Sequence, residues 1–380
     1  MIPLAFCGFL CLGLVLTMLG ANQDYLATDL ELDLVRTAWL ASALALGLLV
    51  GTLGAGPLYD RLPRKPLFVA SILMPASVLF GFGSDLGFRE ALFRFAWIGL
   101  GAGAYDTLFI AAIAERFGAR SAKPMSLLHT GTATGAIIGP LLVAAIATRW
   151  HWALSFQLIG IVHIALAAAA MWLRFPAPPP RARPAKAERH SALSLAIAPF
   201  VIVAFAYLGL ETAMSVFAIP FASDGLGLEV IRGRAAISSM WFGLLAGRLG
   251  AFALRGNLDG RVLIAAGIFC CAAISIGAAT GMRQIELLYF CVGLSLGPVF
   301  PVTIALAGQR FPNALGSVVS LAVGVGSIGC FAVPWLTGAL GDQIGIAAAV
   351  RWLAGWAIIV ALGGFAILRG RARAHAEWTP

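Results

Sequence analysis

The chain has 380 residues, of which 60% are hydrophobic and only 11% are charged. Soluble globular domains average roughly 25% charged residues, and one soluble core could not enclose this much apolar surface. The composition therefore indicates an integral membrane protein and argues against a soluble enzyme or a secreted disulfide scaffold. The formal charge of +9 lies between apolar runs, so it is better explained by membrane orientation than by a nucleic-acid partner.

Long apolar runs follow one another along the whole chain. A transmembrane helix needs roughly 20 such residues, and continuous runs are unlike the alternating pattern of barrel strands. The sequence therefore predicts an all-α integral membrane protein with twelve transmembrane helices, the first of them retained rather than cleaved as a signal peptide. The predicted spans are 3–26, 36–58, 66–84, 90–113, 125–147, 152–173, 194–222, 234–255, 261–281, 286–308, 314–338 and 346–368.

A basic, proline-rich segment separates the first six predicted spans from the last six. Such a composition is typical of a semi-rigid tether, and equal halves around it indicate an internal repeat. The fold class we expect is two pseudo-symmetric six-helix bundles. The predicted domains are an N-terminal bundle at 1–173, a cytoplasmic linker at 174–193, a C-terminal bundle at 194–368 and a cytoplasmic tail at 369–380.

Basic residues favour one side of this topology. Alternate loops, with the end of span eight and the tail, hold 18 of the 26 Lys and Arg residues. By the positive-inside rule, both termini are predicted to be cytoplasmic, in a multi-pass protein of the cell inner membrane. The six cysteines lie inside apolar runs, which is typical of buried small side chains. No metal site and no cofactor are expected.

The loop after span two carries the most specific motif. It reads Gly56-Pro-Leu-Tyr-Asp60-Arg61-Leu-Pro-Arg64-Lys65 and matches the G-x-x-x-D-R-x-x-R-K signature of the major facilitator superfamily. Span five adds Gly135-x-x-x-Gly139-Pro140. Over its whole length the chain resembles a member of that superfamily. The resemblance implies a rocker-switch transporter whose halves surround a central cavity.

The resemblance also implies how the transporter would be gated. In the superfamily the loop aspartate holds the cytoplasmic ends of the two halves together, and breaking that contact helps to open the inward gate. Asp60 and Arg61 would carry this role, with Arg116 as an ionic partner at the inner end of span four. The gating residues implied are Gly56, Asp60, Arg61, Arg64, Lys65 and Arg116.

Further short motifs point to one subgroup. They are Asn22-Gln23-Asp24 at the end of span one, Asp106 in span four, Tyr207-x-Gly209-x-Glu211 in span seven, Trp241-Phe-Gly243 in span eight and Gly297-Pro-Val-Phe300-Pro301 in span ten. Together they resemble the fucose permease group of sugar–proton symporters. That resemblance assigns proton coupling and sugar binding to the acidic residues of spans one and four, here Asp24 and Asp106. Where the family carries span-five amides, this chain has His129 and Thr132.

Ionisable side chains inside the predicted spans are the candidates for proton coupling. Each costs roughly 2.5–3.5 kcal/mol on insertion scales, so each tends to face a cavity or a partner. Asp106 lies mid-span and either carries a proton or makes a structural hydrogen bond. Glu211 either carries a proton or braces Tyr207. Asp24 is either a coupling carboxylate or a solvated loop residue.

Two basic groups and several polar ones complete the candidate site. Arg94 either holds Asp24 or Asp106 charged or snorkels at the interface. His129 either relays protons or packs between helices. The candidates for substrate binding are Asn22, Gln23, Thr132, Gln157, Tyr207 and Trp241.

These features predict a proton-coupled secondary transporter of a small organic solute that works by alternating access. By resemblance, the solute is a sugar or a sugar-like molecule moved by symport. Sodium is the other candidate ion, and a monomer is expected. The alternative is a drug or metabolite–proton antiporter, favoured by the span-five motif and by spans poor in amides. A membrane enzyme acting on lipid-linked substrates is disfavoured because the intramembrane carboxylates are single and widely separated.

Overall fold

The computed structural model is helical throughout the part of the chain that it describes, with no strand among those residues. It divides into two compact units, Met1–Pro184 and Ala185–Pro380. The predicted linker at 174–193 lies outside the described residues. The described residues are 1–83, 85–117, 122–173, 195–253, 259–279, 284–311 and 315–376.

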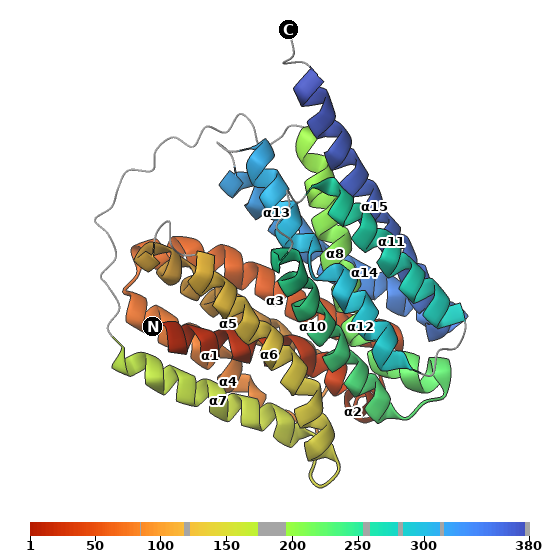
Figure 1. Cartoon of the computed structure of the whole chain (residues 1–380). Helices are drawn as coiled ribbons and strands as arrows, with labels where there is room; N and C mark the ends of the chain where they lie inside the picture. Colours follow the sequence, from red (N-terminus) through yellow and green to blue (C-terminus); the bar gives the residue numbers. More distant parts are fainter. Residues whose placement is uncertain are drawn as a thin grey trace. The chain divides into compact units, whose positions relative to one another are not determined.

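The first unit (red to yellow-green in Figure 1) consists of long helices joined by short connections. Asn22 ends the first helix, so the predicted span 3–26 is two helices rather than one. The third helix begins where the carboxylate of Asp33 accepts a hydrogen bond from the backbone N–H of Arg36 at 2.6 Å, an N-cap interaction. The helices are α1 (Ile2–Ala21), α2 (Gln23–Asp29), α3 (Leu34–Arg61), α4 (Arg64–Leu79), α5 (Phe88–Phe117), α6 (Ala122–Ala147) and α7 (Ala153–Trp172).

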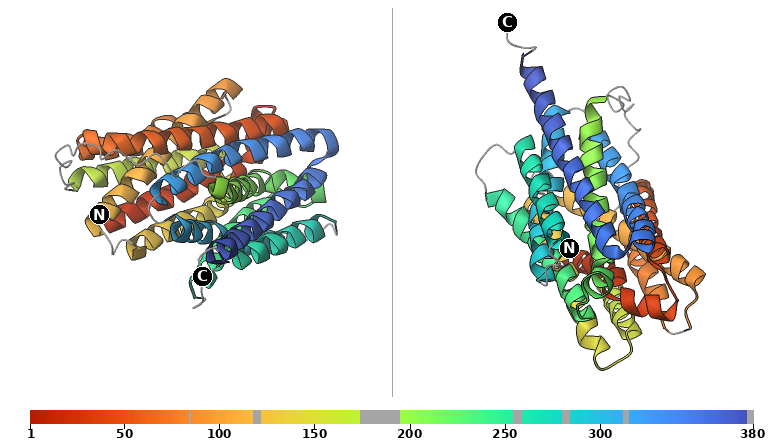
Figure 2. Two further views of the ribbon diagram at one scale, coloured as in Figure 1. Left: turned by 90° about the horizontal axis from the view of Figure 1, so that it is seen from above. Right: turned by 90° about the vertical axis from the view of Figure 1, so that its right-hand side faces the viewer.

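The second unit (green to blue in Figure 1) repeats this organisation. Gly297 and Pro298 split the predicted span 286–308 into two helices, because proline has no N–H to donate. The last helix continues through the predicted start of the tail at 369 and projects past its neighbours (Figure 2). The elements are η2 (Leu195–Ile197), α8 (Ala198–Val216), α9 (Ala218–Pro220), the π-helical turn η3 (Phe221–Gly225), α10 (Val230–Ala253), α11 (Gly260–Ala279), α12 (Ile285–Leu296), α13 (Val299–Arg310), α14 (Leu315–Ile344) and α15 (Ile346–Ala376).

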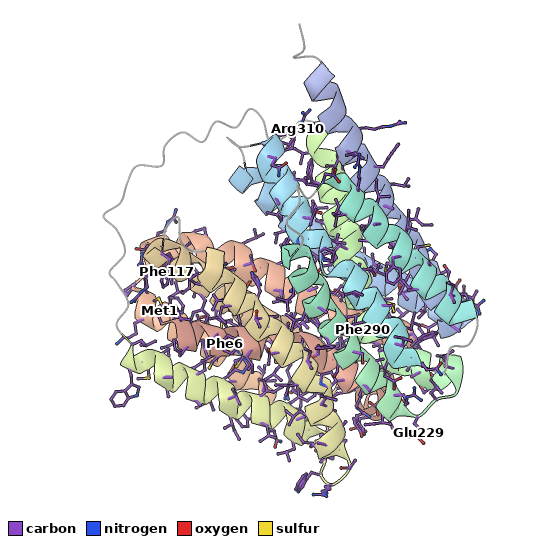
Figure 3. All side chains as sticks on the ribbon, viewed as in Figure 1. Met1, Phe6, Phe117, Glu229, Phe290 and Arg310 are labelled. Carbon is purple, nitrogen blue, oxygen red and sulfur yellow. The ribbon has the colours of Figure 1, made fainter. Side chains whose placement is uncertain are left out.

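Most of these helices are long and apolar enough to cross a membrane. Among the described residues there are 10 such segments, one of which is α12 with α13. The third and eighth predicted spans are occupied by α4, which has 16 residues, and by α10, which carries Arg232, Arg234 and Arg248. Glu229, just before α10, and Arg310, at the end of α13, lie at opposite ends of the second unit (Figure 3). The predicted all-α membrane fold class is confirmed.

Glycines bring the backbones of α3 and α5 into direct contact. The glycines are Gly47 and Gly51 on α3 and Gly99 and Gly103 on α5. A Cβ at any of them would lie 2.0–2.2 Å from a carbonyl oxygen of the partner helix, so no side chain fits there. The spacing of four residues places each pair on one helix face, as in small-xxx-small membrane packing. These glycines hold the predicted second and fourth spans together.

The second unit contains the same arrangement between α10 and α12, the predicted eighth and tenth spans. Here Gly243 and Gly247 face α12, while Gly293 and Gly297 face α10. A Cβ at these positions would lie 1.9–2.5 Å from a carbonyl oxygen of the partner. Equivalent spans therefore use the same spacing for the same contact. The contact between α3 and α5 thus corresponds to the contact between α10 and α12, as an internal repeat predicts.

A second helix pair follows the same rule in both units. In the first unit, α1 packs on α6 through Gly13 and Gly135, where a Cβ would lie 2.0 Å from a partner carbonyl oxygen. In the second unit, α8 packs on α14 through Gly209 and Gly329. The first and fifth spans of each bundle are thus joined at glycines. The two bundles are pseudo-symmetric in their internal packing.

Replacing Gly51 by Ala tests the close contact between α3 and α5. The added Cβ would lie 2.1 Å from the Leu100 carbonyl oxygen, and overpacking of this kind costs about 1–3 kcal/mol. We expect G51A to lower the unfolding temperature of the detergent-purified protein. The matched control is G54A on the same helix, because no atom lies within 4 Å of a Cβ at Gly54. Equal unfolding temperatures for the two variants would contradict the packing argument.

Candidate functional site

Asp106 lies in the middle of α5, three residues after the contact glycine Gly103. Its side chain is half-buried. Within the described part of the chain, no hydrogen bond or ion pair joins its carboxylate to another residue. The neighbouring Tyr105 is fully buried, and its hydroxyl makes no hydrogen bond to the described residues. Asp106 is therefore a carboxylate inside a membrane helix that no described residue neutralises, and the predicted structural hydrogen bond is not found among these residues.

His129 and Thr132 lie one turn apart on α6. The His129 side chain is exposed, and its ring contacts the edge of Phe9 on α1 with centroids 5.4 Å apart. Thr132 is buried, and its hydroxyl makes no hydrogen bond to the described residues. The contact with Phe9 fits the packing interpretation of His129. The free hydroxyl of Thr132 leaves it able to bond another molecule.

Asn22 is fully buried where α1 gives way to α2. Its Nδ2 donates to the Met18 carbonyl oxygen at 3.0 Å, and its Oδ1 accepts from the Ser155 hydroxyl at 3.3 Å. The amide is thus bonded at both ends and ties α1 to α7. Three other predicted residues are buried or half-buried on α2 and α7: Gln23, Asp24 and Gln157.

Arg94 lies one turn into α5 and forms an ion pair with Glu90 on the same helix. Its guanidinium also lies 5.6 Å from the centre of the Phe82 ring. Pairing with Asp24 or Asp106 was one of two interpretations of Arg94, and the observed partner belongs to neither of those carboxylates. The geometry instead supports the alternative of an arginine near the helix end that pairs locally.

The second unit brings three polar side chains together inside the bundle. Tyr207 and Glu211 lie one turn apart on α8, and Arg248 lies on α10. The Nη2 of Arg248 donates to the Tyr207 hydroxyl at 3.2 Å. The Glu211 carboxylate interacts with the same hydroxyl and, through its charge, with Arg248. Its Oε2 is buried without a hydrogen bond to the described residues.

Arg248 was not among the predicted site residues. It is half-buried, and no carboxylate of the described residues lies within 4.0 Å of its guanidinium. By contrast, Arg232 on the same helix is bonded through two nitrogens to Glu286, with Nη2 and Oε2 2.6 Å apart. The sequence carried one signal for Arg248: it is a charged residue within a predicted span, next to the contact glycine Gly247.

Aromatic residues on two further helix positions accompany this cluster, Phe300 on α13 and Trp241 on α10. The Tyr207 ring stacks on Phe300 of α13, with centroids 6.0 Å apart. Trp241 lies seven residues before Arg248, so helix periodicity places both on one face of α10. The Trp241 side chain is buried, and its Nε1 makes no hydrogen bond to the described residues. The second unit thus combines a cation, a carboxylate and aromatic rings within one bundle.

A different cluster joins the ends of three helices in the first unit. The Arg64 Nη1 lies 2.8 Å from the Glu115 Oε2, and its guanidinium stacks over the Tyr59 ring at 4.2 Å. The Tyr59 hydroxyl donates to the same Glu115 oxygen at 2.7 Å. The Arg64 side chain is 1% exposed. These contacts fix the end of α3 and the beginning of α4 against the end of α5.

The other residues of the predicted gating motif lie close by in the sequence. The side chain of Asp60 lies outside the described part of the chain, so its predicted pairing with Arg116 remains a prediction. Lys65 donates to the Met171 carbonyl oxygen at 2.9 Å. Arg61, Lys65 and Arg116 are exposed, whereas Gly56 is half-buried in α3. The ion pair that the structure does contain here is Arg64 with Glu115.

The sequence profile of the Major Facilitator Superfamily matches residues 5–282 of the chain. The chain belongs to the major facilitator superfamily. It is therefore a multi-pass membrane transporter of a small-molecule substrate, and not an enzyme. Membership confirms the resemblance carried by the loop after span two. No group of three or more metal-ligating side chains is present among the described residues.

Relatives within the superfamily differ in what they carry. The chain is 27% identical to the 3-(3-hydroxy-phenyl)propionate transporter of Escherichia coli, over 92% of this chain and 89% of the relative. It is 23% identical to the aspyridones efflux protein of Emericella nidulans, over 86% of this chain and 68% of the relative. A crystal structure of a D-xylose–proton symporter has the same fold, with a TM-score of 0.73 at 17% identity over 96% of each chain.

The cluster of Tyr59, Arg64 and Glu115 can be tested by a double-mutant cycle. We expect R64M and E115Q each to lower the unfolding temperature in detergent, and the double variant to lower it by less than their sum. The coupling should be about 1 kcal/mol, because Glu115 remains partly solvated. The pair of exposed Arg261 and half-buried Asp259, at 3.9 Å, serves as the control and should show no coupling. Additive effects in the first pair would mean that the ion pair does not stabilise this helix end.

Proposed function

We propose that this superfamily member is a proton-coupled secondary active transporter of a small organic solute. The observation that carries the proposal is Asp106, a half-buried carboxylate inside α5 without a partner among the described residues. A permanently charged group in this position is costly. Protonation removes this charge, and deprotonation restores it. A carboxylate that gains and loses a proton in this way can couple proton movement to transport.

In alternating access, proton binding to Asp106, solute binding and proton release follow one another in a fixed order. Asp106 takes a proton from the side with the higher proton activity, and the solute binds in the same conformation. The neutral carboxylic acid lowers the cost of the conformation in which the site is closed to water. Release of the proton on the other side restores the charge and favours reopening. Sodium could neutralise the same carboxylate, so the coupling ion is part of the test.

For the solute, the resemblance to the fucose permease group favours a sugar or sugar-like molecule moved by symport. The D-xylose–proton symporter shares the fold, which fits this choice without deciding it. The alternative is proton-driven export of an amphipathic compound. The Gly135-x-x-x-Gly139-Pro140 motif of α6 and the efflux relative favour that alternative.

In this proposal the junction between α3 and α4 is the inner gate. By the resemblance, Asp60 and Arg61 carry the gating role, while the cluster of Tyr59, Arg64 and Glu115 keeps the helix ends that carry them in place. We also place the protein in the cell inner membrane as a monomer. The positive-inside rule favours an orientation with both termini cytoplasmic.

Substitution of Asp106 tests the coupling directly. The full-length protein is reconstituted in proteoliposomes that contain a pH-sensitive dye, and solutes are added to a wild-type sample and to D106N. We expect solute-dependent proton movement in the wild type and at least a tenfold loss in D106N, because the amide, unlike the carboxylate, does not gain and lose a proton near neutral pH. The matched control is D85N, since Asp85 lies exposed in the connection between α4 and α5; it should behave as wild type.

The outcomes separate the candidates. Proton entry together with added sugars supports symport, and proton exit driven by amphipathic cations supports the exporter. Solute movement that needs sodium and leaves the pH unchanged would contradict proton coupling. Proton movement of wild-type size in D106N would show that Asp106 is not the coupling group.

A further inference from the structure

Arg248 is a cation on α10 that forms no salt bridge with a carboxylate of the described residues, although Glu211 interacts with it through space. Its one hydrogen bond to them is to the Tyr207 hydroxyl, at 3.2 Å, and no carboxylate among them lies within 4.0 Å. A guanidinium has five N–H donors, and an arginine within a membrane helix is normally paired or functional. We propose that the transported solute carries a carboxylate and that Arg248 binds it together with Tyr207. This inference rests on the proposed function, which supplies the transported solute.

The chemistry of the group favours an anion over a neutral solute. A guanidinium presents two parallel N–H donors that match the two oxygens of a carboxylate. A sugar hydroxyl can accept one of these hydrogen bonds, but it leaves the positive charge uncompensated. An organic carboxylate satisfies both the charge and the geometry. Tyr207, already bonded to Arg248, supplies the neighbouring hydroxyl.

Glu211 would couple carboxylate binding to proton binding in the second unit, in addition to the coupling carboxylate Asp106 of the first. The charged and titratable groups facing it are Tyr207 on its own helix, Arg248 on α10 and Cys330 on α14. Without a solute, the charge of Glu211 partly offsets that of Arg248 through space. A bound carboxylate takes over that role, and the two negative charges then repel each other. Proton binding to Glu211 removes the repulsion, so solute and proton enter together with no net charge.

The position of Trp241 sets the length of the solute. Seven residues of α helix separate it from Arg248, which is roughly 10 Å along the axis. The buried Nε1 of Trp241 makes no hydrogen bond to the described residues and is available to an acceptor on the solute. The ring stack of Tyr207 and Phe300 adds an aromatic surface beside the guanidinium. A monocarboxylate with a body of this length that carries a hydrogen-bond acceptor at its far end fits this spacing.

The first test compares matched probes on the unaltered protein. Purified full-length protein in detergent is heated with 3-phenylpropionate or with 3-phenylpropionamide, which has the same shape without the charge, and likewise with gluconate or glucose. We expect the carboxylate of at least one pair to raise the unfolding temperature and its neutral counterpart to leave it unchanged. Stabilisation by neither carboxylate, or equal stabilisation by both members of each pair, would overturn the inference.

Variants then locate the site. R248Q should weaken binding of the stabilising carboxylate between ~10-fold and ~100-fold, the loss expected for a charge-assisted hydrogen bond. R248K should retain part of the affinity, because it keeps the charge but not the paired donors. The control R261Q removes an exposed arginine of α11 and should bind as wild type. Wild-type affinity in R248Q would overturn the assignment, and the unfolding temperature without probe shows that each variant is folded.

Proton movement separates this inference from the proposed function. Carboxylate-driven proton uptake in proteoliposomes that is lost in R248Q supports both. Uptake driven equally by glucose or by the amide would overturn the carboxylate inference while leaving proton-coupled transport intact. Carboxylate binding without any proton movement would retain the Arg248 site and contradict proton coupling.

Discussion

The hydrocarbon of the membrane offers no hydrogen-bond partner, and the rest of the structure follows from that constraint. The backbone satisfies itself in helices, and each charge must lie near a helix end, find a partner or serve a function. Arg94 pairs with Glu90 near the start of α5, and Arg232 pairs with Glu286 near the starts of α10 and α12. Arg248, five residues before the end of α10, is not closed into such a pair with a described residue, which is why it stands out.

The same constraint explains how the helices are held together. Lipid tails are as apolar as leucine, so burial of apolar side chains gives helices little reason to associate in a bilayer. Close approach of backbones supplies dispersion contacts instead, and glycine permits it. Gly47 and Gly51 on α3, like Gly243 and Gly247 on α10, bring a whole helix turn against a partner carbonyl. Each bundle thereby has a fixed frame on which a few polar side chains can be positioned.

Much of the fold could be predicted because its signals are local. Contiguous stretches of sequence show the span lengths, the repeat and the motif that joins α3 to α4. These features predict the family and the helix order. Contacts between distant residues were not accessible in this way. Glu115 lies 56 residues after Tyr59, and nothing in the sequence specifies that Arg64 would pair with it rather than stay in solvent. Arg248 was missed for the same reason, since its contact with Tyr207 spans 41 residues.

The two arginine clusters differ in a way that matters for transport. Arg64 and Glu115 are in direct contact at 2.8 Å, so any other anion would first have to break that pair. Arg248 and Glu211 interact through space without closing a salt bridge among the described residues. A closed pair stabilises a fixed structure, because removing one partner leaves the other charge without compensation. An open pair keeps the cation available. A solute anion can then bind Arg248 while a proton neutralises Glu211.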